Sequence, residues 1–301
     1  MQLFLITMKT SMSSYLVTGS SGQLGQCFQT VAKEFPETNL FFASRNEVDI
    51  TRPETIVNSY SKNSFVGIIN CAAYTNVDLA ENEQESTFKI NTEGIQNIID
   101  FAETLNLSII NFSSDYIFDG GSSEPYQEEE LTNPIGVYGK SKLQAEVILS
   151  KSNCKSVTIR TSWLFSHYTK NFVKTIARIA KERTELNVVD DQWGRPTYGI
   201  DLARTVLKLI SNDTMYTFSI LHYANQGVCN WKVFADAIVN ELECKTIIQG
   251  ISTSAYSTLA KRPKYTILNT GRIENKLGVA IPTWQESLKK CMKILKNDES
   301  L

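Results

Sequence analysis

The sequence has only two histidines, His167 and His222, and neither lies in a cluster of potential metal ligands. Its six cysteines show no C-x-x-C spacing and lack the density of a disulfide framework. These scarcities argue against a structural zinc site, and they predict a protein of the reducing cytoplasm.

The sequence also lacks an excess of basic residues and any long apolar run. Thirty Lys and Arg residues are balanced by 32 Asp and Glu residues, so we predict no nucleic-acid partner. No apolar run approaches the roughly 20 residues that a membrane span needs, and the apolar start at residues 1–6 is too short for a signal segment. We expect no membrane association, and we expect residues 1–13 to be an extension with little structure.

The first clear pattern is a short apolar strand at residues 15–18 that leads directly into a glycine-rich turn at 19–25. Apolar side chains then recur at helical spacing, at Leu24, Phe28, Val31 and Phe35. Glycines let the backbone approach a pyrophosphate, whose charge the N-terminus of the helix stabilises. The pattern predicts a dinucleotide-binding turn.

Strands and helices continue to alternate along the first half of the chain. Apolar strands are expected at residues 40–44, 67–73, 107–113 and 156–160. Thr51 and Glu54 predict a capping box, with Pro53 early in the helix that follows. We predict an α/β fold: a doubly wound parallel Rossmann sheet over residues 1–165, and a smaller α/β substrate-binding lobe over residues 166–301.

Tyr138 and Lys142 lie four residues apart and would project from one face of a helix. An ammonium close to a phenol favours the phenolate and lowers the phenol pKa towards neutrality. The pair therefore suits proton transfer to or from a carbonyl or an alcohol. A solvated helix face is the alternative for this spacing taken alone.

The glycine turn, the Tyr138-x-x-x-Lys142 spacing and a serine at the end of an intervening strand together resemble the extended short-chain dehydrogenase/reductase family. Within it, several segments resemble the dTDP-4-dehydrorhamnose reductases: residues 22–25, 48–51, 70–81, 112–120, 137–146, 160–165, 191–197 and 261–263. The resemblance covers almost the whole chain from Tyr15. It implies reduction of the 4-keto group of a dTDP-4-keto-6-deoxy sugar with NAD(P)H.

The resemblance also implies roles for individual residues. Tyr138 would protonate the substrate oxygen, Lys142 would lower the tyrosine pKa and hold the ribose hydroxyls, and Ser114 would bind the carbonyl. Cofactor contacts are implied at Gly19, Ser21, Gly22, Gln23, Leu24, Gly25, Asp49, Ile50, Ala72, Ala73, Tyr74 and Thr75. Substrate contacts are implied at Ser114, Asp115, Tyr116, Trp163 and Arg262.

Arg262, beside Pro263, suits a bidentate grip on the sugar-nucleotide diphosphate, and Arg195 is a second candidate. Alternatives remain for several of these residues taken alone. Ser114 could be a polar residue at a strand end, Asp49 could cap the helix after Thr51, and Trp163 could belong to the core. Most arginines are solvated surface residues.

The expected end of the second strand carries Ser44 and Arg45 where NAD-specific folds place an acidic residue. Ser44 offers a hydroxyl without charge, and Arg45 can pair with a 2′-phosphate. We therefore predict a preference for NADPH, with NADH usable. The alternative is that Arg45 is a solvated loop residue and either cofactor binds.

Three other functions fit the fold. A nucleotide-sugar dehydratase would need a second acidic residue where this chain has Tyr116, whereas an epimerase is harder to exclude by motif. A non-catalytic NADP-binding regulatory subunit would not need the proton relay. The resemblance suggests a homodimer, and because one magnesium-binding glutamate of some relatives would fall near Cys27, we expect no magnesium ion.

Overall fold

The computed structural model describes residues 14–61, 63–210 and 213–297. Its centre is a six-stranded parallel sheet in the order β10-β5-β4-β3-β1-β2. The strands are β1 (Ser14–Thr18), β2 (Asn39–Ala43), β3 (Gly67–Asn70), β4 (Ser108–Ser114), β5 (Ser156–Thr161) and β10 (Ile220–His222). The predicted Rossmann-like sheet is therefore confirmed.

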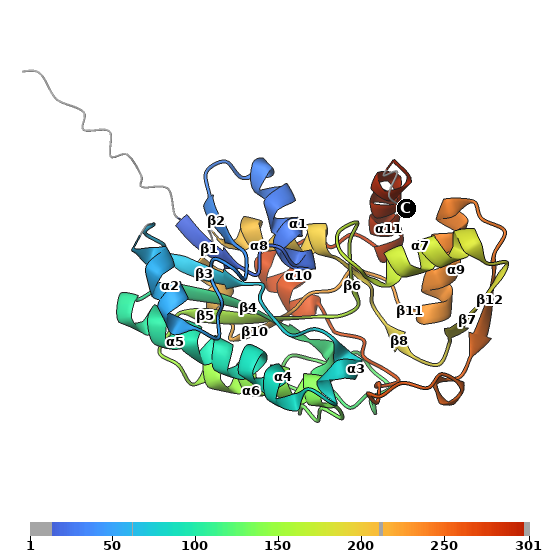
Figure 1. Cartoon of the computed structure of the whole chain (residues 1–301), viewed down its shortest axis with the longest axis horizontal. Helices are drawn as coiled ribbons and strands as arrows, with labels where there is room; N and C mark the ends of the chain where they lie inside the picture. Colours follow the sequence, from blue (N-terminus) through green and yellow to red (C-terminus); the bar gives the residue numbers. More distant parts are fainter. Residues whose placement is uncertain (1–13, 62, 211–212, 298–301) are drawn as a thin grey trace, which may run out of the picture.

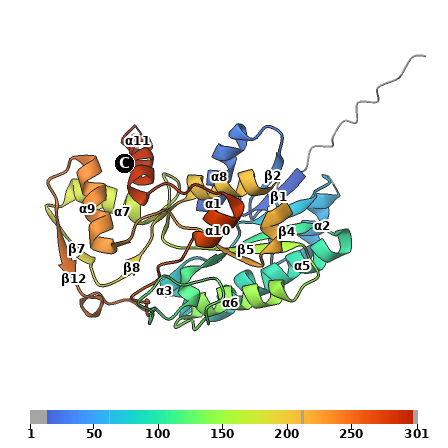
Figure 2. The ribbon, with the colours of Figure 1, turned by 180° about the vertical axis from the view of Figure 1, so that it is seen from behind.

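Helices cover both faces of this sheet (Figures 1 and 2). One face carries α1 (Gln23–Val31), α8 (Gly199–Ile210) and α10 (Gly271–Leu277), and the other carries α2 (Pro53–Tyr60), α5 (Gly94–Leu105) and α6 (Val137–Ser150). Successive strand residues point to opposite faces, so Leu16 and Val17 enter two different cores, as do Ile109 and Ile110. Burial on both faces explains the nearly continuous apolar strands.

A second lobe lies beyond the carboxyl ends of the strands (Figure 1). Its helices are α7 (Phe172–Glu182), α9 (Trp231–Leu242) and α11 (Trp284–Lys296). Its parallel strand pair is β7 (Glu185–Val189) with β12 (Ile247–Ile251), and β8 (Trp193–Gly194) pairs antiparallel with β11 (Cys229–Asn230). The side chain of Asn230 accepts a hydrogen bond from the N–H of Val233 at 2.8 Å and so caps the start of α9.

The chain crosses between the two parts more than once. Near residue 165 it leaves the sheet through β6 (Leu164–Phe165), which pairs with β9 (Thr197–Tyr198). It then returns through α8 and β10, whose Leu221 pairs with Ile159 of β5. The predicted boundary at 165 therefore marks the first departure from the sheet, and later segments come back to it.

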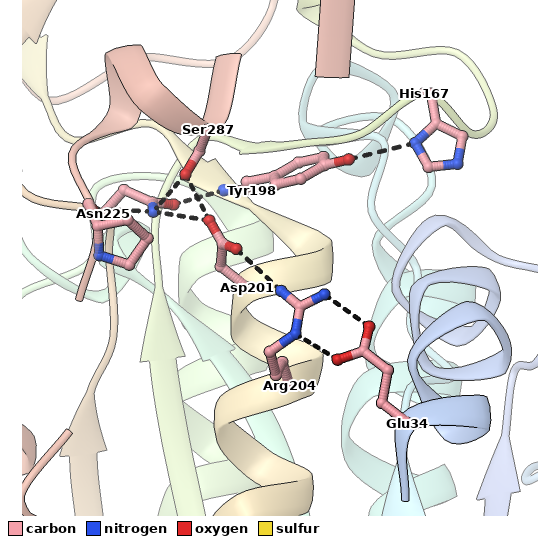
Figure 3. A network of polar contacts seen from close by, with 8 residues as sticks. Glu34, His167, Tyr198, Asp201, Arg204, Asn225 and Ser287 are labelled. Atoms are coloured by element: carbon pink, nitrogen blue, oxygen red, sulfur yellow. Dashed lines mark hydrogen bonds and ion pairs between the residues drawn. The ribbon is translucent and has the colours of Figure 1, made fainter. Parts of the chain in front are cut away.

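A polar network that is buried around Asp201 and reaches the surface at Glu34 joins the sheet to the second lobe (Figure 3). Asp201 of α8 accepts hydrogen bonds from Ser287 of α11 and, at 3.1 Å, from the Asn225 amide. Arg204 of α8 reaches 3.3 Å from Asp201 and donates to both carboxylate oxygens of Glu34, each at 2.7 Å. Because Glu34 follows α1, the helix after the glycine turn is linked to α11 through α8.

The start of α2 differs from the prediction, and one other predicted segment lies outside the described residues. The predicted capping box at Thr51 is wrong, because α2 begins at Pro53 with Arg52 as its N-cap and without a side-chain cap. Thr51 instead donates from its N–H and its hydroxyl to Asp49 Oδ1, at 3.0 and 2.8 Å. The expected extension at residues 1–13 lies outside the described residues.

Candidate active site

A cavity of about 1010 Å³ lies between the carboxyl ends of β3, β4 and β5 and the second lobe. Its sheet side is lined by most of the predicted site residues: Gly22, Gln23, Leu24, Ala72, Ala73, Thr75, Ser114, Asp115, Tyr116, Tyr138 and Lys142. Trp163 and Arg262 line it as well. This is the position where ligands bind in open α/β sheets.

The glycine turn is packed so closely that it excludes side chains. Gly19 has φ +63°, and a Cβ there would come within 2.7 Å of the Ala72 backbone. A Cβ on Gly25 would meet Ser20 Cα at 2.5 Å. The turn thus brings the start of α1, which has no side-chain cap, to the end of β3.

The cavity wall beside this turn fits a dinucleotide. Gln23 is the first residue of α1 and lines the cavity, and its buried Nε2 has no hydrogen-bond partner among the described residues. A buried amide without a partner is costly, and a ligand phosphate oxygen would satisfy it. The start of the helix would add its dipole and free N–H groups to the binding of that anion.

Several of the predicted cofactor residues lie outside the cavity lining. Arg45 has a 71% exposed side chain and pairs with Asp49 at 3.4 Å. Asp49 accepts hydrogen bonds from Thr51 in the turn before α2, but it does not cap this helix, whose N-cap is Arg52 without a side-chain cap. Ile50 is buried in the core against Gly94, and the Tyr74 hydroxyl donates to Glu83, away from the cavity.

Ser114 ends β4, and Tyr138 and Lys142 lie in the first turns of α6. The Ser114 hydroxyl donates to Asp115 Oδ1 at 3.0 Å, and the Tyr138 phenol lies within hydrogen-bonding reach of the same hydroxyl. A Cβ on Gly139 would approach the Tyr116 carbonyl oxygen to 2.1 Å. Only glycine there lets α6 come this close to the end of β4, and this approach brings Tyr138 to Ser114.

Burial sets the ionisation of these groups. It raises the pKa of Tyr138 to about 12 and lowers the pKa of Lys142 to about 8. The sequence had suggested a lowered tyrosine pKa, and the structure gives the opposite direction because desolvation of the phenolate dominates. Burial also raises the pKa of Asp115 to about 6.

Tyr116 lies edge-to-face against Tyr138, with ring centroids 5.9 Å apart. It occupies the position at which a nucleotide-sugar dehydratase would need a second acidic residue. Desolvation in the packed site raises the pKa of the Tyr116 phenol above the ordinary value of a tyrosine. The site therefore holds one buried carboxyl group, Asp115, beside the serine and two tyrosines.

Arg262 reaches the cavity as part of a bidentate ion pair. Its guanidinium donates to Asp78 Oδ1 at 3.1 Å and to Oδ2 at 2.7 Å. These hydrogen bonds hold the pKa of Asp78 below its usual range. Arg195, the other predicted candidate, is not among the lining residues, and it donates to Thr270 at 3.4 Å.

Trp231 is a cavity residue that sequence reasoning missed. Its ring stacks on Trp163 with centroids 3.5 Å apart and planes 8° from parallel, and its Nε1–H donates to Gln192 Oε1 at 3.1 Å. Other residues missed on this side are Phe172, Gln192, Thr253, Tyr256 and Thr258. Gln192 lies in one of the segments that carried the resemblance, whereas Trp231 had only its place after the cap Asn230 as a signal.

No group of three or more His, Cys, Asp or Glu side chains in the described part of the chain could hold a metal ion. Cys27 is fully buried and contacts Gly199. Over the same described ranges, no helix is long and apolar enough to cross a membrane.

Comparison with known proteins identifies relatives along nearly the whole chain. Residues 13–297 match the family described as the RmlD substrate binding domain. The chain is 38% identical over 291 residues to a dTDP-4-dehydrorhamnose reductase of Aggregatibacter actinomycetemcomitans. The matched region covers 92% of this chain and 98% of that protein.

Two solved structures resemble the fold closely. The dTDP-4-dehydrorhamnose reductase of Clostridium acetobutylicum gives a TM-score of 0.89 at 34% identity and covers 94% of this chain and 99% of that one. The enzyme of the same name from Bacillus anthracis, in complex with NADP, gives 0.89 at 33% identity and covers 94% and 100%.

Proposed function

The chain belongs to the family of the RmlD substrate binding domain, and we propose that it reduces the 4-keto group of a dTDP-4-keto-6-deoxy sugar with NADPH. The substrate that fits best is dTDP-4-dehydro-L-rhamnose, and the product, dTDP-L-rhamnose, would serve the synthesis of cell-surface polysaccharides. NADH is usable in its place. The supporting observation is the group of Ser114, Tyr138 and Lys142 at the sheet edge of one large cavity, in which Ser114 and Lys142 are buried.

The chain's own residues divide the work of a carbonyl reduction. A bound nicotinamide would supply the hydride. Ser114 binds the carbonyl oxygen, and Tyr138 gives this oxygen a proton. Because the Tyr138 pKa is about 12, the phenol is fully protonated at neutral pH and can donate. Lys142 stabilises the resulting phenolate and holds the ribose of the cofactor.

The second lobe and the loop of Arg262 would hold the sugar nucleotide. Arg262 would exchange its Asp78 partner for the diphosphate, a group that suits its planar fork equally well. Trp163 would lie against the sugar. Gly22, Gln23 and Leu24 would hold the pyrophosphate of the cofactor, and the buried Gln23 amide needs such a partner.

The test is to incubate purified protein with dTDP-4-keto-6-deoxy sugars and reduced cofactor. Stoichiometric loss of NADPH absorbance with formation of the 6-deoxy alcohol is expected. A dehydratase that forms 4-keto-6-deoxy sugars would leave both sugar and cofactor unchanged, as would a regulatory subunit, and an epimerase would convert the sugar without consuming cofactor. Either of these results would overturn the proposal.

Two further properties follow from the resemblance and are part of the proposal. The protein would be a homodimer, which sedimentation equilibrium tests. It would work in the cytoplasm, where its substrate is made, and fractionation of cells followed by immunoblotting tests that location.

A further inference from the structure

Glu47 binds the group that was expected to receive the extra phosphate of NADPH. One oxygen of its carboxylate accepts hydrogen bonds from both the Ser44 N–H, at 2.8 Å, and the Ser44 hydroxyl, at 2.7 Å. These bonds hold the pKa of Glu47 below its usual range, so the carboxylate is charged at neutral pH. Ser44 follows β2 directly, at the carboxyl edge of the sheet.

The second expected phosphate partner is also paired with a carboxylate. Arg45 contacts Asp49 at 3.4 Å, and Asp49 is itself held by Thr51. The charged groups that face this corner from its own segment are thus Arg45, Glu47 and Asp49. The neighbouring glycine turn lies against this strand end, since Ser20 donates its N–H to the Ala43 carbonyl at 3.0 Å, and residues 19–25 carry no charged side chain.

The end of β2 is where a dinucleotide fold binds the adenosine ribose, and an acidic residue there accepts a hydrogen bond from the 2′-hydroxyl. In this chain the residue at the strand end is a serine. The carboxylate of Glu47, three residues later, lies at the same position through its hydrogen bond with Ser44. A phosphate on that hydroxyl would have to displace Glu47 from Ser44 and would meet its negative charge.

We propose that Glu47 is a cofactor-specificity residue whose carboxylate binds the adenosine ribose of NADH and competes with the 2′-phosphate of NADPH for Ser44. The proposal rests on the proposed function, which supplies the class of cofactor. It adds Glu47 to Ser44 and Arg45 as a residue that determines cofactor preference. Glu47 thereby limits the preference for NADPH and lets NADH serve.

The experiment compares wild type with Glu47→Gln by calorimetric titration of NADP⁺ and NAD⁺ without any sugar. The dissociation constant for NADP⁺ should fall and that for NAD⁺ should rise, so that their ratio shifts about tenfold towards NADP⁺ at low salt. Glu47→Asp keeps the charge and should shift the ratio of the two dissociation constants by less than about twofold. Glu37→Gln removes a charge from an exposed residue between α1 and β2 and should leave the ratio unchanged.

A ratio in Glu47→Gln equal to that of wild type would overturn the proposal, as would an equal shift in Glu37→Gln. Weaker binding of both cofactors by the same factor would also overturn it, because that pattern means a damaged turn. The result is independent of the reaction: a shifted ratio in a protein that fails to reduce the keto sugar sinks the proposed function alone.

Discussion

The two sides of the cavity are built in different ways. On the sheet side, the lining comes from short continuous segments at the ends of neighbouring strands, such as Ala72 and Ala73 after β3 and Ser114 to Tyr116 after β4. On the side of the second lobe, Trp163 meets Trp231 across a long stretch of sequence. The sheet side carries the hydrogen-bonded proton donor, whereas the lobe side offers stacked rings and scattered polar groups.

The difference teaches which functions are local in sequence. A parallel sheet aligns strand ends automatically, so chemistry placed after each strand is gathered by the topology alone. A substrate lobe has no such rule, and its residues meet only through tertiary packing. Substitutions on the sheet side should therefore change turnover, and substitutions on the lobe side should change the affinity for the sugar nucleotide.

The largest expected effect is that of Tyr138→Phe. It removes the proton donor but keeps the ring that packs against Tyr116, so kcat should fall by roughly 100-fold or more with little change in cofactor affinity. Steady-state kinetics and cofactor titration measure the two quantities. Near-normal turnover would remove Tyr138 from the mechanism and erase the contrast between the sides.

The next effect concerns Arg262. Replacement by Ala should weaken binding of the sugar nucleotide by on the order of 2 kcal/mol, because a charge-assisted pair with the diphosphate is lost. Calorimetry with a dTDP-sugar measures this. Lys261→Ala, an exposed neighbour outside the cavity lining, is the matched control. Unchanged affinity in the Arg262 variant would make its ion pair with Asp78 purely structural.

A third prediction uses the burial of Lys142. Its pKa is about 8 in the folded protein against 10.5 as a free group, so the unfolded chain binds the proton more tightly. The cost to stability is fully present below about pH 8 and disappears as pH rises towards 10.5. Wild type should therefore gain on the order of 1 to 2 kcal/mol relative to Lys142→Met over that range.

Urea unfolding of wild type and Lys142→Met at several pH values measures this difference. Parallel stability curves for the two proteins would mean that the Lys142 ammonium is well solvated. The sheet side would then lack the dry environment that sets it apart from the lobe side.

The smallest effect expected is that of Trp231→Leu. Loss of the stack should leave Trp163 less ordered and raise the KM for the sugar nucleotide by about fivefold, with the KM for NADPH unchanged. Trp193→Leu, on an exposed residue outside the cavity lining, is the control. A change in the KM for NADPH would show that the two sides are not separate.

The same contrast decides how much could be predicted from the sequence. The strand, the glycine turn and the helix that begins at Gln23 are contiguous, and so are Tyr138 and Lys142, so short-range spacing was sufficient for them. The stack of Trp231 on Trp163 depends on tertiary packing that brings the start of α9 to the end of β5, and no local pattern encodes it. Likewise, spacing suggested a lowered pKa for Tyr138, but the desolvation that raises this pKa depends on the packing around the phenol in the folded structure.

Glu47 is an intermediate case. It stands three residues after Ser44, and a side chain at that distance in a turn can reach back to the N–H and hydroxyl of the first residue. The prediction of cofactor preference rested on Ser44 and Arg45 at the strand end and did not include this carboxylate.

The position of β10 in the sheet has a consequence for co-translational folding. β10 pairs with β5, so when residues 14–161 have emerged, β5 is still an open edge with unpaired backbone groups. That edge stays uncovered until the whole of α7 and α8 has been made, and it is a template for pairing with other nascent chains during this interval. A fragment cut at residue 165 would carry this edge permanently, so it should aggregate even though it contains the glycine turn, Ser114, Tyr138 and Lys142.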